Sequence, residues 1–199
     1  MDFPHLLLLA FGAFWIGLAI RPHDRTVWMT ENAFTVASVV VLAATYSRWP
    51  LGNLSYALIA ALLVLHTIGG YFTYVRVPYD SLTSRLFGFK LGERLGWTRN
   101  HYDRLVHFAF GLLIAYPVFE MLERYARPAG SWNYFLSPAL IMAASMLFEV
   151  IEWFAALKLG GSAGSEYVGT QGDEWDAQKD MALAAGGSII ATAVTPLLR

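Results

Sequence analysis

Six long apolar runs are the feature that most constrains what this 199-residue chain can fold into. About 30 Å of bilayer hydrocarbon needs roughly 20 residues at 1.5 Å each, so such runs predict transmembrane helices. The predicted spans are Pro4 to Ile20, Asn32 to Tyr46, Ser55 to Tyr74, Tyr102 to Arg124, Tyr134 to Leu157 and Asp176 to Leu198. The expected fold class is therefore all-α, a polytopic membrane helical bundle of about six helices.

Composition supports a membrane protein and excludes other classes. Hydrophobic residues make up 56% of the chain and charged residues 15%, whereas soluble domains are about 25% charged. Fourteen basic residues balance fifteen acidic ones without a long basic tract, so we expect no nucleic-acid partner. The absence of cysteine excludes disulfides, thiolate zinc sites and cysteine nucleophiles, so any metal would be bound by oxygen and imidazole.

The first apolar run is predicted to be a retained span. The chain has Asp2 and His5 at the start of this run instead of a positively charged segment, and no cleavage site of small residues follows it. Trp residues lie mostly near the predicted span ends, as in an interfacial aromatic belt.

Charged residues, Pro and Gly return between the apolar runs. The predicted connections are Arg21 to Glu31, Arg48 to Asn53, Val75 to Asn100, Tyr125 to Asn133 and Lys158 to Gly172. None marks a domain boundary, so we expect one membrane domain over residues 1–199. The third connection mixes Leu82, Arg85, Leu86, Phe89 and Lys90 at helix-like spacing, which predicts a short amphipathic helix. Lys and Arg are concentrated in the first, third and fifth connections, which predicts both termini outside.

The motif HYDRLVH, residues 101–107, opens the fourth predicted span. Asp103 and His107 are four residues apart, so they share one helix face and could bind one ion or share a proton. An Asp that orients a His, or that interacts with the helix dipole, explains the same pair.

The motif FEVIEW, residues 148–153, places Glu149 and Glu152 three apart inside an apolar run. Both carboxylates therefore lie on one side of a buried helix, where two anions repel each other. Either one is protonated, or a cation lies between them, or arginines such as Arg76 and Arg104 pair with them. Ionisable groups inside a membrane are functional by default, which favours a site.

The segment GTQGDEWDAQKD, residues 169–180, precedes the last span. Asp173, Asp176 and Asp180 are spaced by three and four, so a helix beginning near Gly172 would carry them on one stripe. Gln171 lies just before these residues in the sequence, so its side-chain oxygen could point to the place that the three Asp side chains face. Helix capping explains Asp173 but not Asp180, which lies inside the predicted span.

In HTIGGYFTYVRVP, residues 66–78, His66 lies in mid-span and Tyr74 follows eight residues later on roughly the same helix face. The two side chains could lie next to the carboxylate and histidine ligands of a site without binding its ion themselves. A packed, hydrogen-bonded core histidine is the alternative, and both readings stay open.

Together these motifs resemble those of the YjdF family of bacterial inner-membrane proteins, a domain of unknown function. The resemblance rests on NHYDRLVHFAFG (residues 100–111), FEVIEW, VGTQGDEWDAQKDMALAAGGS (residues 168–188) and HTIGGYFTYVRVP, and covers most of the chain from about His66 onward. It implies a multi-pass protein of the bacterial inner (plasma) membrane. The Asp and His of one span and the Asp residues of the last are more distantly similar to VanZ-like membrane proteins. Neither resemblance implies a reaction.

The residues themselves predict a divalent-metal site near one membrane surface, because six carboxylates and one imidazole suit Mg, Mn, Zn or Fe. The predicted metal ligands are Asp103, His107, Glu149, Glu152, Asp173, Asp176 and Asp180. Glu149, Glu152 and His107 are the predicted catalytic residues, and His66, Tyr74, Gln171 and Arg104 are predicted to surround the site. No other cofactor is expected, and the substrate would be a lipid or a lipid-linked molecule in the bilayer.

Two other functions remain open from the sequence. Buried carboxylates with a mid-span His also make a proton relay or a cation path, although no inverted repeat and no matched pair of broken helices accompanies them. A non-catalytic component of a membrane complex would use the same acids in buried ion pairs. A homo-oligomer is compatible with either.

Overall fold

The computed structural model describes residues 2–198, apart from the side chains at 162, 163, 165, 166 and 198. Its long helices are α1 (Phe3–Ala19), α2 (Arg25–Thr45), α3 (Asn53–Tyr71), α6 (Tyr102–Met121), α7 (Trp132–Leu159) and α9 (Asp176–Val194). Five of these helices, α2, α3, α6, α7 and α9, are long and apolar enough to cross a bilayer. For α6 the span continues to Ala126, and for α9 it continues to Leu197. The sixth, α1, is a shorter apolar helix of 17 residues. The all-α membrane bundle predicted from the sequence is confirmed.

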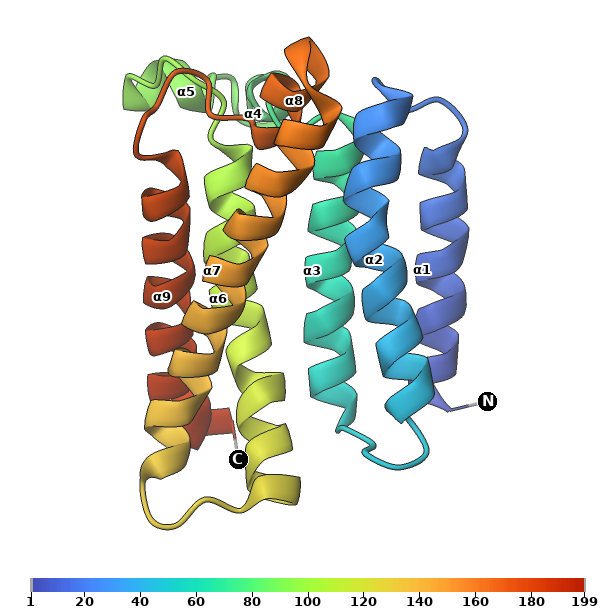
Figure 1. The fold of residues 1–199 in the computed structure, drawn as a ribbon, viewed down its shortest axis with the longest axis vertical. Coiled ribbons are helices and arrows are strands. Elements are labelled where there is room, and N and C mark those ends of the chain that lie inside the picture. Colours follow the sequence, from blue (N-terminus) through green and yellow to red (C-terminus); the bar gives the residue numbers. More distant parts are fainter. Residues whose placement is uncertain (1, 199) are drawn as a thin grey trace.

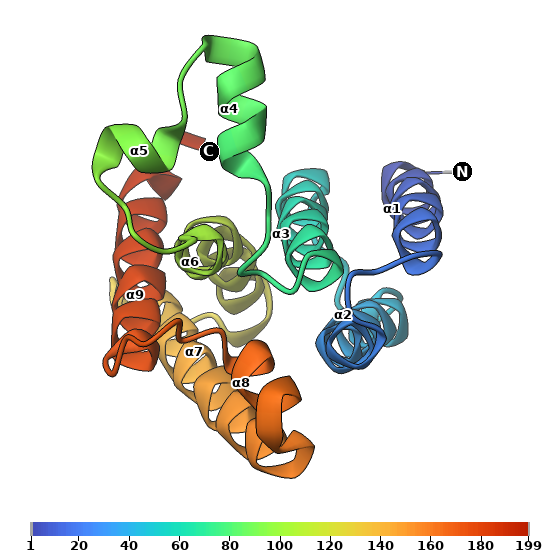
Figure 2. The same cartoon turned by 90° about the horizontal axis from the view of Figure 1, so that it is seen from above.

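The long helices run up and down, with both ends of the chain at one end of the bundle (Figure 1). The short helices α4 (Tyr79–Phe87), α5 (Leu91–Leu95) and α8 (Gly161–Val168) lie at the opposite end, called here the α4–α5 end (Figure 1). Seen from above, α3 stands between α6 and the pair α1 and α2, while α7 and α9 lie on the other side of α6 (Figure 2). The first, third and fifth connections therefore share one end, as the orientation prediction requires.

The second span starts earlier than the sequence predicted. The Asp24 side chain accepts hydrogen bonds from the backbone N–H groups of Thr26 (2.7 Å) and Val27 (2.9 Å), and this N-cap begins α2 at Arg25. Glu31, assigned to a connection by its charge, is instead inside the helix and only 3% exposed. Glu31 is thus a buried acid of the bundle at a position where hydropathy indicated an exposed loop.

The third span ends earlier than predicted, at Tyr71 instead of Tyr74. Thr73 and Tyr74 both have φ of 54°, a left-handed conformation that residues other than glycine rarely adopt. The Tyr74 ring lies against Gly69, where an added Cβ would approach it to 2.5 Å. The chain therefore turns back on α3 and sends the Tyr74 ring into the bundle.

The predicted amphipathic helix after this turn is confirmed for Leu82, Arg85 and Leu86, which lie in α4, whereas Phe89 and Lys90 lie between α4 and α5. Both helices end at a glycine in the left-handed conformation, Gly88 and Gly96. The connection predicted as Lys158 to Gly172 differs from the prediction. Helix α7 continues to Leu159, and α8 occupies most of the remainder. Beyond α6, residues Leu122–Ala126 continue the chain as a π-helical turn.

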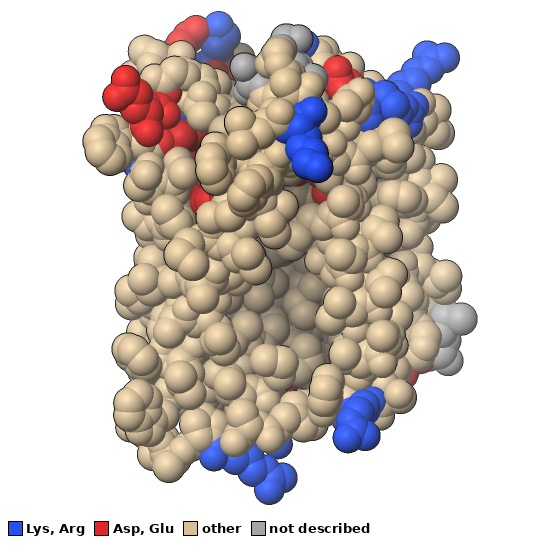
Figure 3. All heavy atoms as spheres, in the orientation of Figure 1, with Lys and Arg blue, Asp and Glu red and all other residues tan. Residues whose placement is uncertain are grey.

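One face of the molecule shows how the charges are distributed (Figure 3). Lys, Arg, Asp and Glu side chains gather at the two ends, and the broad band between them is almost free of charge (Figure 3). This is the pattern of a protein whose middle faces hydrocarbon. The same face is hollowed near its centre, between α7 and α2 (Figures 1 and 3).

Helices α6 and α9 touch through glycines. A Cβ added at Gly187 would lie 2.3 Å from the carbonyl oxygen of Phe108, and one added at Gly111 would lie 1.9 Å from that of Ala184. Small residues permit such a close approach of two backbones inside a membrane. Asp103 and Asp180 lie about two turns before these glycines, so the contact holds the parts of α6 and α9 that carry them side by side.

Replacing Gly187 with Ala should push α6 and α9 apart and lower stability by about 1–3 kcal/mol, the usual cost of overpacking. Gly186→Ala is the matched control, because no atom lies within 4 Å of a Cβ added there. Thermal unfolding of both variants in the same detergent checks the prediction. Equal melting temperatures for the two would contradict the close contact.

Candidate functional site

Three side chains from two helices converge near the α4–α5 end of the bundle. Asp103 and His107 lie one turn apart on α6, and Asp180 lies on α9 one turn before Ala184, whose carbonyl oxygen meets Gly111. One ligand atom from each residue lies within 4.8 Å of the others. His107 and Asp180 are buried, being 7% and 2% exposed. The structure thus brings together three of the predicted metal ligands, which we call the α6–α9 cluster.

Helix α7 adds a fourth group. Glu149 Oε1 lies 3.5 Å from His107 Nε2, and Asp103 Oδ1 lies 3.6 Å from the same nitrogen. Neither Asp180 Oδ1 nor Glu149 Oε1 has a hydrogen-bond partner among the described residues. Buried polar atoms normally have a partner, so these two oxygens mark a place where one is missing.

A cavity of about 130 Å³ adjoins the cluster. Asp103 and His107 form part of its wall, and Glu152 of α7 contributes a third polar group that is 9% exposed. Much of the remaining wall is apolar, with Phe34 from α2 and Phe148 from α7 in contact at 5.6 Å between ring centroids. The structure therefore separates the FEVIEW acids: Glu149 faces His107, and Glu152 faces the cavity.

His66 and Tyr74 line the same cavity. The Tyr74 hydroxyl lies 2.5 Å from His66 Nδ1, and His66 Nε2 lies 3.0 Å from the backbone carbonyl oxygen of Glu31. This arrangement fits a His66 ring that accepts from Tyr74 through Nδ1 and donates through Nε2. The prediction that His66 and Tyr74 share a helix face is wrong, because α3 ends at Tyr71 and Tyr74 reaches His66 through the turn that follows.

Sequence analysis missed Glu31. Its Oε2 lies 3.8 Å from His66 Nε2, so it adds a buried carboxylate behind the cavity wall. The signal was present in VWMTENAF, where one acid stands among apolar residues directly before an apolar run. Averaged hydropathy hid it, because Arg25 and Asp24 nearby gave the segment the polarity of a loop.

Asp173 and Asp176, also predicted as metal ligands, have cationic partners in the structure. Arg99 Nη1 lies 2.5 Å from Asp176 Oδ1, and Arg104 contacts both Asp173 and Asp176. Lys179 Nζ lies 2.6 Å from Asp173 Oδ2. These two acids are not members of the α6–α9 cluster. Arg104, predicted beside the metal, instead belongs to this ion-pair network.

The predicted stripe of three Asp residues is also incomplete, because α9 begins at Asp176 and Asp173 precedes it. Gln171 is exposed and does not face the cluster. Its amide oxygen accepts from the Asn100 N–H, and its amide nitrogen donates to the Asn100 carbonyl, both at 2.9 Å. Arg99 also donates to the carbonyls of Gly169 and Thr170. These contacts fasten the loop of residues 169–175 over the start of α6.

The ion pairs of Asp173 predict a pH dependence. Hydrogen bonds from Lys179, from the Trp175 N–H and from Arg104 lower the pKa of Asp173 below its ordinary value of 3.8. A lowered pKa stabilises the fold above the ordinary value, and this contribution is lost as the pH falls through the lowered one. The stability difference between wild type and Asp173→Asn should therefore be full near neutrality and shrink below about pH 4.

Thermal unfolding across a pH series measures that difference, with the exposed Glu174→Gln as the control in the same loop. A difference that stays constant down to about pH 3 would contradict the assigned ion pairs.

Comparison with known proteins agrees with this architecture. The model of the family described as "Predicted membrane protein (DUF2238)" matches residues 3–199. The chain is 39% identical over 171 residues to the Inner membrane protein YjdF of Escherichia coli (strain K12), covering 85% of this chain and 78% of that protein. No solved structure matches.

The resemblance to the YjdF family and the placement in a bacterial inner membrane are confirmed by these matches. Neither match is to a VanZ-like protein, so that similarity stays an expectation. The chain belongs to the DUF2238 family of predicted membrane proteins.

Proposed function

We propose that this protein binds a divalent metal ion within the membrane and uses it as a hydrolase or transferase acting on a lipid or lipid-linked substrate. The observation that carries the proposal is the convergence of Asp103, His107 and Asp180, with Asp180 Oδ1 buried and without a hydrogen-bond partner among the described residues. Glu149 completes the ligand set from α7.

The donor set fits a cation for two reasons. Carboxylate oxygens and one imidazole nitrogen are ligands that Mg, Mn, Zn and Fe accept, and helical bundles commonly build metal sites from inward-facing acids and His on several helices. Carboxylates gathered in a low dielectric also repel each other unless they are protonated or bound to a cation. The Arg99 and Arg104 side chains do not meet this need, because they pair with Asp173 and Asp176.

A bound metal would supply Lewis-acid polarisation of an ester or phosphoryl oxygen. Glu152 faces the cavity beside the cluster, where it is placed to accept a proton from a water molecule or a substrate hydroxyl. His107, the other predicted base, is occupied as a ligand in this arrangement. Glu152 is therefore the residue to which we assign the general base.

A lipid substrate agrees with the position of the cavity. Phe34 and Phe148 stand at its wall from α2 and α7, and the surface between these helices is hollowed on the face that lies within the uncharged band (Figure 3). A hydrocarbon chain could lie in this hollow while the polar group reaches the cluster. The Tyr74 hydroxyl and His66 would then face the substrate from the opposite wall.

Elemental analysis of protein purified without chelator tests the proposal. We expect about one divalent metal ion per chain in wild type, and loss of most of it in Asp180→Asn and His107→Gln, since each removes a ligand. Glu174→Gln, an exposed acid from the same segment, is the control and should retain the metal. Wild-type protein that carries no metal and takes up none on dialysis against Mn²⁺, Zn²⁺ or Mg²⁺ would overturn the proposal.

A proton-coupled carrier is the second candidate, favoured by the contacts that join Tyr74, His66 and Glu31 behind the cavity. Such a chain of titratable groups is typical of proton relays in membranes. In proteoliposomes with an imposed pH gradient, a carrier should show proton flux that Glu152→Gln and His66→Phe reduce by about tenfold or more. Flux equal to that of empty vesicles, or insensitive to both substitutions, would exclude this candidate.

A further inference from the structure

A second cavity, of about 190 Å³, lies between α1, α2 and α3 and is separate from the α6–α9 cluster. Side chains from the α1 and α2 segments contact each other at both ends of this cavity. Toward the α4–α5 end, Trp15 packs on Trp28 at 5.5 Å between ring centroids and donates to the Asn32 side chain. At the other end, the Tyr46 hydroxyl donates to Asp2 at 2.6 Å. The two helices therefore enclose a slot, which we call the α1–α2 slot.

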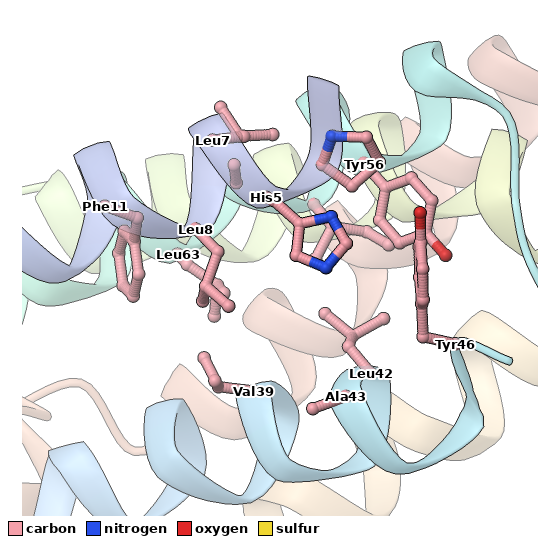
Figure 4. A pocket seen from close by; sticks show the side chains of 13 residues that line it. His5, Leu7, Leu8, Phe11, Val39, Leu42, Ala43, Tyr46, Tyr56 and Leu63 are labelled. Atoms are coloured by element: carbon pink, nitrogen blue, oxygen red, sulfur yellow. The ribbon is translucent and has the colours of Figure 1, made fainter. Parts of the chain in front are cut away.

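The slot is apolar for most of its length and polar at one end. Figure 4 shows Leu8, Phe11, Val39 and Leu63 around its inner part and the rings of His5, Tyr46 and Tyr56 at the other end. His5 and Tyr56 lie near the starts of α1 and α3, and Tyr46 lies at the end of α2, so the polar rings belong to the end of the bundle where the chain begins (Figure 1). The slot is therefore polar where a lipid headgroup would lie and apolar where an acyl chain would lie, and its apolar part points toward the centre of the bilayer.

Water is a poor occupant for the inner part, because buried water needs two or more polar partners. An apolar cavity of about 150 Å³ in another protein binds benzene, so this volume accommodates a segment of hydrocarbon. Leu8 and Ala43 of the lining are exposed on the bundle surface, so the slot opens toward the surrounding lipid. In a bilayer, the hydrocarbon next to this opening is the acyl chain of a lipid.

The charge at the polar end indicates the headgroup. Hydrogen bonds from Tyr46 and then His5 hold the pKa of Asp2 below its ordinary value of 3.8, so its carboxylate is ionised at neutral pH. The Asp2 side chain is 52% exposed, so a headgroup can reach it. The Asp2 carboxylate also contacts the His5 ring, and its exposed part offers a negative charge that complements a headgroup carrying an amine.

We propose that the α1–α2 slot binds an acyl chain of an amine-bearing phospholipid, with the headgroup amine beside Asp2. The proposal does not depend on the metal site, which lies across α3 and α6 from the slot. It assigns α1 a role as one wall of a lipid site.

Native mass spectrometry of protein recovered from vesicles of equal phosphatidylethanolamine and phosphatidylglycerol tests the proposal. Wild type should retain one phosphatidylethanolamine through mild detergent. Ala60→Phe places a ring in the slot from α3 and should abolish retention, whereas Ala61→Phe, the same change at the exposed neighbouring position outside the lining, should not. Val39→Phe blocks the slot from α2 and serves if Ala60→Phe does not fold.

Asp2→Asn tests the headgroup assignment, because it leaves the apolar lining unchanged. One charge at a membrane surface changes lipid affinity about fivefold, so the preference for phosphatidylethanolamine should fall by about that factor. Asp180→Asn should retain the lipid, which separates this proposal from the metal site. Equal retention of both lipids by wild type, or equal retention by Ala60→Phe and Ala61→Phe, would overturn the proposal.

Discussion

The burial of several carboxylates around one histidine, inside a helical membrane bundle, is the constraint on which the rest of the structure depends. Asp103, Asp180 and Glu149 come from three helices, and Glu152 lies close by at the cavity. Ionised groups cost several kcal/mol in a low dielectric, and like charges add to that cost. A fold that brings these side chains together must hold the helices in place against this repulsion, and it must either keep some of the carboxyls protonated or provide a countercharge.

The structure holds them in two ways. Gly111 and Gly187 bring the backbones of α6 and α9 into direct contact, which is closer than any larger side chain permits. Just outside that contact, Arg99 and Arg104 join the start of α6 to Asp173 and Asp176 at the start of α9. The arginines neutralise the outer acids at the membrane surface, whereas Asp180 has no ion pair with a Lys or Arg side chain among the described residues. A divalent cation is the countercharge that would fit there.

Much of the fold could be predicted from hydropathy, because a span of about 20 residues is needed in any bilayer. The prediction was wrong at the start of α2, where capping by Asp24 begins a helix whose buried face carries Glu31. Averaged hydropathy registers a charge but not the side of the helix on which it lies. Tyr74 reached His66 through a left-handed turn, which no periodicity argument contains.

Within the candidate site, the spacing of residues in the sequence predicted which side chains of one helix lie together. It did not predict which side chains of different helices meet. The four-residue spacing of Asp103 and His107 and the depth of Asp180 in its span both pointed inward, and the structure places these residues together. Asp173 and Asp176 were predicted as metal ligands together with Asp180 because all three share one helical spacing. Their pairing with Arg99 and Arg104 crosses about 70 residues of chain and is set by the approach of α6 to α9. Such partners become visible only when the helices are arranged in space.

Pulsed electron paramagnetic resonance of Mn²⁺ bound to the purified protein would detect a metal ion held by the α6–α9 cluster. We expect a bound ion with electron spin echo modulation from one histidine nitrogen, and loss of that modulation in His107→Gln. A signal from aqueous Mn²⁺ alone, or a bound ion whose modulation is unchanged in His107→Gln, would contradict a metal site built on the α6–α9 cluster.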